Sequence, residues 1–178
     1  MSDVVELYRR GLEEFGKRLH AVKDDQWSAP TPCSEWSVRD LANHVIGENR
    51  WVPPLMEGKT IQDVGDALEG DLLGDDPASA WDMAAKEALA AMEEPGALDR
   101  TVHLSFGDVP GRVYLGQLLI DHAIHSWDLA RAIGAGEDLD HGLVRFAYDE
   151  LTPQVEEWRQ GGAFADRVDV PEDADLQT

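Results

Sequence analysis

The chain has 178 residues and 43% of them are hydrophobic, which is enough for one domain with a proper core and too little for two. Fifteen basic residues stand against 36 acidic ones, and the formal net charge of −21 excludes phosphate backbones and anionic lipid surfaces as expected partners. No apolar run approaches the roughly 20 residues of a membrane span, and the chain begins with an acidic amphipathic segment instead of a signal peptide, so we expect a cytoplasmic protein.

Two helices are predicted in the first third of the chain. Apolar side chains recur at spacings of three and four over residues 3–23, which is the pattern of an amphipathic helix. The segment 24–37 holds two prolines, and we interpret it as a tight connection that Trp27 and Trp36 pin by packing and not by stacking on a ligand. A second helix is expected over residues 38–52.

The second helix has both a start and a stop pattern. Ser37 and Asp40 stand at the spacing of a capping box, in which each side chain bonds the backbone N–H of the other residue. Pro53 and Pro54 lack an N–H, and we expect them to end the helix. Residues 55–75 are rich in Gly and Asp and predict a long loop over one end of the molecule.

The middle of the chain predicts a third helix and one pair of strands. Residues 77–94 keep helical periodicity, with Pro77 at a favourable first position. Residues 101–113 alternate between apolar and polar side chains around a possible turn at 107–108, which predicts a short β-hairpin. His103 in this stretch is expected to be a surface or edge residue.

Two further helices complete the predicted all-α fold. A central helix over residues 114–133 is followed by a final helix over 139–160, which Pro153 is expected to kink or break. The acidic tail, residues 161–178, is expected to be irregular. The predicted organisation is therefore one helical domain over residues 1–160 and a short tail.

The central helix carries polar side chains in an otherwise apolar sequence. Asp121, His125 and Asp128 stand at i, i+4 and i+7, so they share one helix face. A carboxylate in a buried helix is costly unless a cation or hydrogen-bond donors meet it, so we expect a partner against this face. A carboxylate and an imidazole one helical turn apart can coordinate the same divalent metal ion.

His44 of the second helix is the best candidate for a further ligand. It lies one turn from Leu41 and beside Val45, on or at the edge of the buried face, and can face the central helix. With Asp121 and His125 it would give two imidazoles and one carboxylate and leave a position for water or substrate, as in catalytic zinc sites. The spacing alone also fits a metal-free buried hydrogen-bond network.

Two segments resemble a known family. Residues 30–47, PTPCSEWSVRDLANHVIG, and residues 121–132, DHAIHSWDLARA, match in order and spacing the actinobacterial proteins related to the N-terminal domain of mycothiol-dependent maleylpyruvate isomerase, within the DinB-like superfamily. The resemblance implies a DinB-like four-helix bundle with an additional C-terminal helix that holds one divalent metal ion. Its metal ligands would fall on His44, Asp121 and His125, with Asp121 where the isomerase usually has the longer Glu.

The resemblance also implies a chemistry. Zinc is the expected ion, with nickel or another late first-row ion as the alternative. Such an ion would bind a thiol as a thiolate, because coordination removes the S–H proton at neutral pH. The resemblance implies mycothiol as that thiol. The isomerase has a second domain that contributes to its active site, so we expect a related thiol-dependent isomerase or transferase acting on an electrophile and not the isomerase reaction itself. The alternative is a non-catalytic metal-binding or stress-responsive bundle whose ion is structural.

The roles of two side chains near these motifs are open. Asp128 and His122 are candidates for orienting a ligand or shuttling protons, because ligating histidines usually donate their other nitrogen to an acceptor. The interpretation we favour is structural, with Asp128 paired to an arginine such as Arg39 or Arg131 and with His122 half-buried.

Two more residues carry alternatives. Glu48, one turn after His44, is either a further ligand or a solvated acid. Cys33 is the one cysteine, which agrees with a reducing compartment; it precedes a helix start that can stabilise a thiolate, but we interpret it as a small buried side chain. The expected partners are a small-molecule thiol and an electrophile, and both a monomer and a homodimer fit the sequence.

Overall fold

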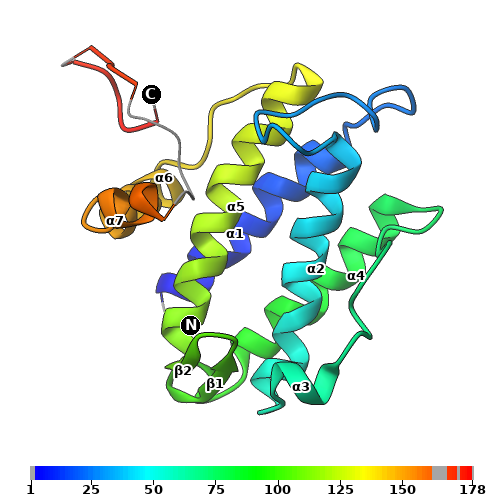
Figure 1. Ribbon diagram of the computed structural model, residues 1–178, viewed down its shortest axis with the longest axis vertical. Helices are drawn as coiled ribbons and strands as arrows, with labels where there is room; N and C mark the ends of the chain where they lie inside the picture. Colours follow the sequence, from blue (N-terminus) through cyan, green and yellow to red (C-terminus); the bar gives the residue numbers. More distant parts are fainter. Residues whose placement is uncertain (1–2, 162–167, 172, 178) are drawn as a thin grey trace.

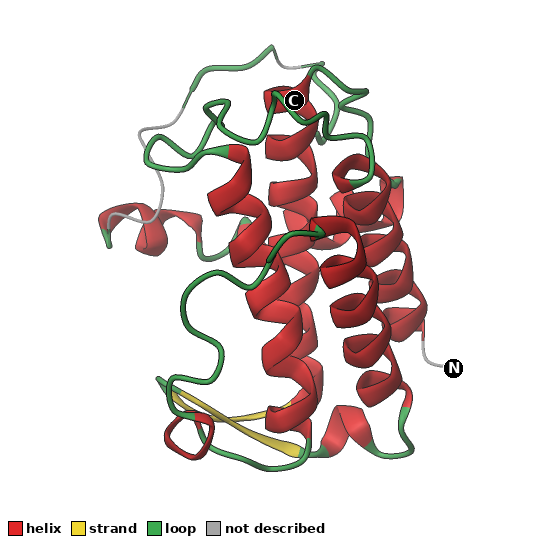
Figure 2. Ribbon diagram, turned by 90° about the vertical axis from the view of Figure 1, so that its right-hand side faces the viewer, coloured by secondary structure: helices red, strands yellow, loops and turns green. Residues whose placement is uncertain are grey.

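The fold is a closed bundle of four long helices. The computed structural model describes residues 3–161, 168–171 and 173–177, and the longest helices in this part are α1 (Asp3–Leu19), α2 (Val38–Met56), α4 (Pro77–Glu93) and α5 (Gly111–Ile133). They run side by side (Figures 1 and 2), and each contacts two others, in the cyclic order α1, α5, α2, α4. The prediction of an all-α bundle with one short hairpin is confirmed.

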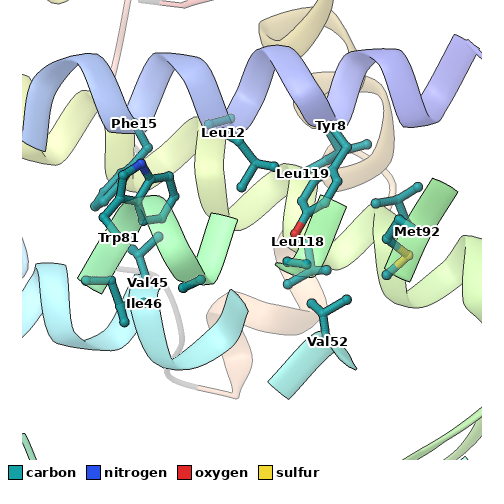
Figure 3. Close-up of a cluster of buried hydrophobic side chains, with 14 of the residues drawn as sticks. Tyr8, Leu12, Phe15, Val45, Ile46, Val52, Trp81, Met92, Leu118 and Leu119 are labelled. Atoms are coloured by element: carbon teal, nitrogen blue, oxygen red, sulfur yellow. The ribbon is translucent and has the colours of Figure 1, made fainter. Parts of the chain in front are cut away.

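A single hydrophobic core fills the space between the four helices. Tyr8 and Phe15 of α1 are fully buried, and the Phe15 ring packs against Trp81 of α4 with 4.8 Å between ring centroids. Leu118 and Leu119 of α5 close the same cluster (Figure 3). Each side chain of this size contributes roughly 1.5 to 3 kcal/mol on full burial, so the core fixes the position of α5 and of the polar side chains that α5 carries.

The prediction that Pro53 and Pro54 end α2 is wrong, because the helix continues through both to Met56. Neither proline can donate to the helix ladder, so the carbonyls of Asn49 and Arg50, four residues earlier, lack their usual helical donors. The extra turn buries Leu55 and Met56, each only 1% exposed. Arg100 also donates to the Met56 carbonyl at 2.7 Å. Tertiary burial thus outweighs the local stop pattern.

The hairpin forms, but its second strand and the start of α5 come earlier than expected. β1 (Thr101–Leu104) pairs antiparallel with β2 (Gly107–Pro110), and α5 begins at Gly111. A Cβ atom on Gly111 would lie 2.2 Å from the backbone oxygen of Ala97, so only glycine permits this approach. The earlier start puts Tyr114 in helical register with the polar face of α5.

The predicted loop over residues 55–75 contains a short helix and is tied to α2. The Asn43 side chain donates to the Gly70 carbonyl at 2.9 Å and accepts from the Leu72 N–H at 2.7 Å. The remaining short elements of the described chain are α3 (Ile61–Val64), a 3₁₀ turn η1 (Ala97–Asp99), α6 (His141–Leu151) and α7 (Val155–Gln160).

The C-terminal region follows the prediction as far as the structure describes it. The final helix is broken at Pro153 into α6 and α7. Residues 162–167, 172 and 178 of the expected irregular tail lie outside the described residues, and the described tail positions belong to no helix or strand. The division into a domain over 1–160 and a tail stays a prediction. Among the described helices, none is both long and apolar enough to cross a membrane.

Candidate metal centre

The loop before α2 is held in a defined shape that brings two side chains to the bundle surface. The Thr31 N–H and hydroxyl both donate to the Trp36 carbonyl, at 3.1 and 2.9 Å. The predicted capping box is present, with Ser37 and Asp40 bonding each other's backbone N–H. This loop and cap together fix Cys33 and Trp36 beside the N-terminal turns of α2.

The structure brings together His44, Asp121 and His125, the three predicted metal-ligand residues. The Nε2 atoms of His44 and His125 lie 3.1 and 3.3 Å from the same Asp121 oxygen, Oδ1. The two imidazole rings meet edge to face, with 5.1 Å between their centroids. One ligand atom from each of the three residues lies within 4.8 Å of the others, so the group is able to hold a single ion.

Two observations indicate that a divalent ion fits this group. The second carboxylate oxygen of Asp121, Oδ2, is buried and has no hydrogen-bond partner among the described residues, although a buried carboxylate oxygen normally has one. An ion about 2.1 Å from each ligand in tetrahedral geometry holds the ligand atoms about 3.4 Å apart, close to the distances between Asp121 and the two histidines. Two imidazoles and a carboxylate suit zinc and its neighbours.

Asp128 supports the site and does not pair with an arginine. Its Oδ2 lies 3.0 Å from Nδ1 of His125 and 3.4 Å from the thiol sulfur of Cys33, which donates to it. Arg39 and Arg131 pair with other acids, so the structural pairing predicted for Asp128 is wrong. An acid at Nδ1 holds the imidazole so that Nε2 points to Asp121, which is the arrangement of many metal-ligating histidines.

The charges of the group follow from these contacts. Burial lowers the pKa of His125, but hydrogen bonds with Asp121 and Asp128 outweigh it and raise the pKa to about 9. Burial raises the pKa of Asp121, but the contacts with His125 and His44 reverse this and hold it well below the usual range. In the metal-free protein His125 is therefore a cation between two carboxylates, with a proton on each ring nitrogen.

Cys33 lines the site but is not a thiolate. Its side chain is half-buried, and burial together with the charge of Asp128 raises the pKa of the thiol to about 11. The interpretation as a small buried side chain is therefore only partly right. Cys33, His125 and Asp128 form a second group with ligand atoms within 4.8 Å of one another. Because metals bind the thiolate, the protonated thiol makes this second group the weaker ligand set.

Trp36 has a contact that the sequence interpretation did not include. Its ring packs against the core, as expected, and also lies against both imidazoles. Its centroid is 4.8 Å from that of His44 and 5.7 Å from that of His125. The tryptophan thus shields one side of the candidate ligand group from water. The sequence offers only its place before the capping box as a hint of this role.

His122 faces the core and not the candidate metal site. It is fully buried instead of half-buried, and burial lowers its pKa. Its Nδ1 lies 2.6 Å from the Leu118 carbonyl, and its Nε2 lies 3.1 Å from the side-chain nitrogen of Asn49. With both ring nitrogens engaged in the core, His122 neither orients a ligand nor shuttles a proton.

The ligand group lies in the wall of an open cavity of about 1370 Å³. The cavity lies between the loop before α2, the helices α2 and α5, the tip of the hairpin and the link between α6 and α7. Glu48 lines it, and burial followed by the charge of Asp121 raises the pKa of this acid. Its apolar lining comes from Trp36, Phe106, Leu118, Ile120 and Ile124.

Comparison with known proteins places the chain in a family. Residues 8–130 match the model of the mycothiol maleylpyruvate isomerase N-terminal domain. The chain belongs to this family. The matched segment includes all three residues of the candidate ligand group. Two Mycobacterium tuberculosis proteins, both named only as uncharacterized, are 34% identical over 146 residues, which cover 80% of this chain and 74% of theirs.

Solved structures of this family have the same fold. The crystal structures of the mycothiol-dependent maleylpyruvate isomerase and of a histidine-to-alanine mutant each align with a TM-score of 0.67, covering 90% of this chain and 71% of theirs. The sequence identity is 17%, so this likeness establishes the fold alone. The function must be argued from the site of this chain.

Proposed function

We propose that this member of the mycothiol maleylpyruvate isomerase N-terminal domain family binds a divalent metal ion through His44, Asp121 and His125 and is a thiol-dependent isomerase or transferase. One observation carries the proposal: the three potential ligand atoms converge at an open cavity, beside a buried Asp121 oxygen with no partner in the described structure. A purely structural ion would not need this access to solvent. The family name of the related isomerase supports mycothiol as the thiol.

The residues around the group have distinct tasks in this proposal. A bound ion would act as a Lewis acid that holds the thiol as a thiolate. Asp128 keeps the proton on Nδ1 of His125, so that the Nε2 lone pair is free for coordination. Trp36 excludes water from one side of the imidazoles. Glu48 lines the cavity, and its carboxylate is the base that we assign to take the thiol proton and pass it to solvent.

The proposed reaction is addition to a conjugated double bond. The thiolate sulfur forms a C–S bond with the carbon β to a carbonyl, and the electron pair of the double bond moves to the carbonyl oxygen. In an isomerase, the C–C bond rotates, the double bond re-forms and the C–S bond breaks, which returns the thiolate. In a transferase, the electron pair returns from the carbonyl oxygen to the α carbon, which takes a proton from water, and the C–S bond remains.

Cobalt substitution tests the proposal directly. Adding mycothiol to the cobalt form should give a thiolate-to-metal absorption band with release of a proton, because a thiol must ionise to coordinate. The band should be absent in His44→Ala and present in His103→Ala, whose histidine lies on β1 and pairs with Asp108. A cobalt form that binds no low-molecular-weight thiol would favour the non-catalytic metal-binding alternative.

A further inference from the structure

Tyr114 lines the cavity and has a buried hydroxyl that no described residue engages. It stands seven residues before Asp121, on the same face of α5, and is 4% exposed. Its hydroxyl has no hydrogen-bond partner among the described residues, although Tyr114 lines the cavity wall. The other buried tyrosine of the bundle, Tyr8, donates to Asn49 Oδ1 at 2.7 Å. A buried hydroxyl without a partner is costly, so its retention at a cavity points to a ligand.

The Tyr114 hydroxyl stays protonated, so it can donate or accept a hydrogen bond but carries no charge. Burial raises the pKa of Tyr114 well above its ordinary range, and the charges of Glu48 and Asp121 raise it further. Gln117, three residues further along α5, is an uncharged polar residue of the same lining. A ligand atom that meets Tyr114 therefore meets a neutral hydrogen-bond donor.

The charge of the lining limits what that ligand can be. The lining carries the acids Glu35, Glu48, Asp121 and Asp128, and within the described part of the chain it includes neither lysine nor arginine. In the metal-free protein the positive charge of His125 is already paired with Asp121 and Asp128, so the remaining acids of the lining would repel a carboxylate ligand. The apolar part of the lining, with Trp36 and the exposed Phe106 at the hairpin turn, suits a hydrophobic ligand body.

We propose that Tyr114 donates a hydrogen bond to the carbonyl oxygen of an uncharged, partly apolar conjugated electrophile bound in this cavity. The inference rests on the proposed function, since it names the electrophile class of that same site. The carbonyl oxygen gains negative charge as sulfur adds to the double bond, so a donor at that oxygen stabilises the transition state more than the ground state. Tyr114 is then a catalytic residue of the proposed reaction.

The test uses benzylideneacetone as the probe, a neutral conjugated ketone, without any thiol. Its dissociation constant is measured by tryptophan fluorescence, and its C=O stretch by difference infrared spectroscopy, in both chelator-treated and zinc-loaded protein. In Tyr114→Phe the dissociation constant should rise roughly three- to tenfold, as expected for one neutral hydrogen bond. The bound C=O stretch should shift to higher wavenumber. Tyr148→Phe, which alters an exposed tyrosine of α6, should change neither value.

Two further arms make the result decisive. In the chelator-treated protein the para-carboxylate analogue of the probe should bind at least about tenfold more weakly than the ketone, because the lining acids repel it. Tyr114→Phe should leave the thermal midpoint unchanged or raise it, whereas Tyr8→Phe should lower it, because only Tyr8 loses a hydrogen bond within the protein. An unshifted C=O band, tighter binding of the carboxylate, or a loss of stability in Tyr114→Phe would each overturn the inference.

The probe experiment and the cobalt experiment can fail separately. Probe binding needs no thiol and is read in protein without metal, so a Tyr114 effect can stand when cobalt shows no thiolate band. That outcome would remove the thiol chemistry and leave a binding site for neutral carbonyl compounds. If the cobalt form shows a thiolate band but Tyr114→Phe changes neither the dissociation constant nor the C=O stretch of the probe, the proposed function stands and the role of Tyr114 is refuted.

Discussion

Binding of zinc should release one proton from His125. In the metal-free protein the pKa of this imidazole is raised to about 9 by Asp121 and Asp128, which outweigh its burial. At about pH 7 roughly one molecule in a hundred then has a neutral His125, and only that form can offer Nε2 to an ion. The affinity near pH 7 should therefore be about 100-fold weaker than its limit at high pH, a cost of about 2.7 kcal/mol.

The measurement is a series of zinc titrations against a competing chelator at pH values from about 6 to 8, with proton release followed in weak buffer. The affinity should rise about tenfold per pH unit on account of His125. His103→Ala should reproduce the wild-type curve, since this residue lies on the hairpin, and His125→Ala should lose zinc binding. Affinity that does not depend on pH, or zinc retained by His125→Ala, would refute the assignment of His125 as a ligand that must first lose a proton.

The same protonation state predicts how the stability of the metal-free protein depends on pH. The pKa of His125 rises from 6.5 to about 9 on folding, and its side chain is only 12% exposed. A raised pKa contributes stability that is fully present below about pH 6.5 and is lost as the pH rises through about 9. The free energy of unfolding should fall by about 3 kcal/mol over this interval, measured by urea denaturation. His125→Ala should lack this part of the pH profile.

Three further predictions follow from other parts of the structure. Alkylation of Cys33 near pH 7 should be roughly 100-fold slower than that of an ordinary cysteine, since burial and Asp128 raise its pKa to about 11. Asp128→Asn should speed the alkylation, and Cys33→Ser should keep zinc. Gly111→Ala should lower the free energy of unfolding by about 1 to 3 kcal/mol because its Cβ would overlap the Ala97 backbone, which a urea titration would show. His122→Ala should destabilise the fold by roughly 3 kcal/mol while zinc content stays at the wild-type level; a loss of zinc without a loss of stability would contradict its structural role.

The part of the site that the sequence predicts is the part set by helix periodicity. Asp121 and His125 share a face because they are four residues apart in a regular helix, and this is visible without a structure. His44 needs a second helix at the correct rotation, and the resemblance to the family supplied that information. The three side chains lie together as expected, while their role as ligands remains to be tested by metal binding.

The features that the sequence did not predict depend on tertiary contacts. Tyr114 joins the site because α5 starts at Gly111, and that start is decided by a close approach to the backbone of another segment. The run of two prolines would end an isolated helix, but the burial of Leu55 and Met56 extends it. The partner of Asp128 is a histidine one turn earlier, because Arg39 and Arg131 pair instead with two loop acids, Asp71 and Glu137. Spacing along the chain places Asp128 and His125 on one helix face, but it does not show which of these tertiary contacts form.

The neighbouring histidines of α5 show how one helix serves both stability and chemistry. His122 and His125 are three residues apart, yet they differ in charge because their surroundings differ. The first lies among aromatic rings and core amides, where burial lowers its pKa and a neutral ring satisfies both partners. The second lies between two carboxylates at the cavity, where the same desolvation is outweighed and the ring becomes a cation. In the proposed metal complex a divalent ion would replace the proton on Nε2 of His125 and add one positive charge beside the same two carboxylates.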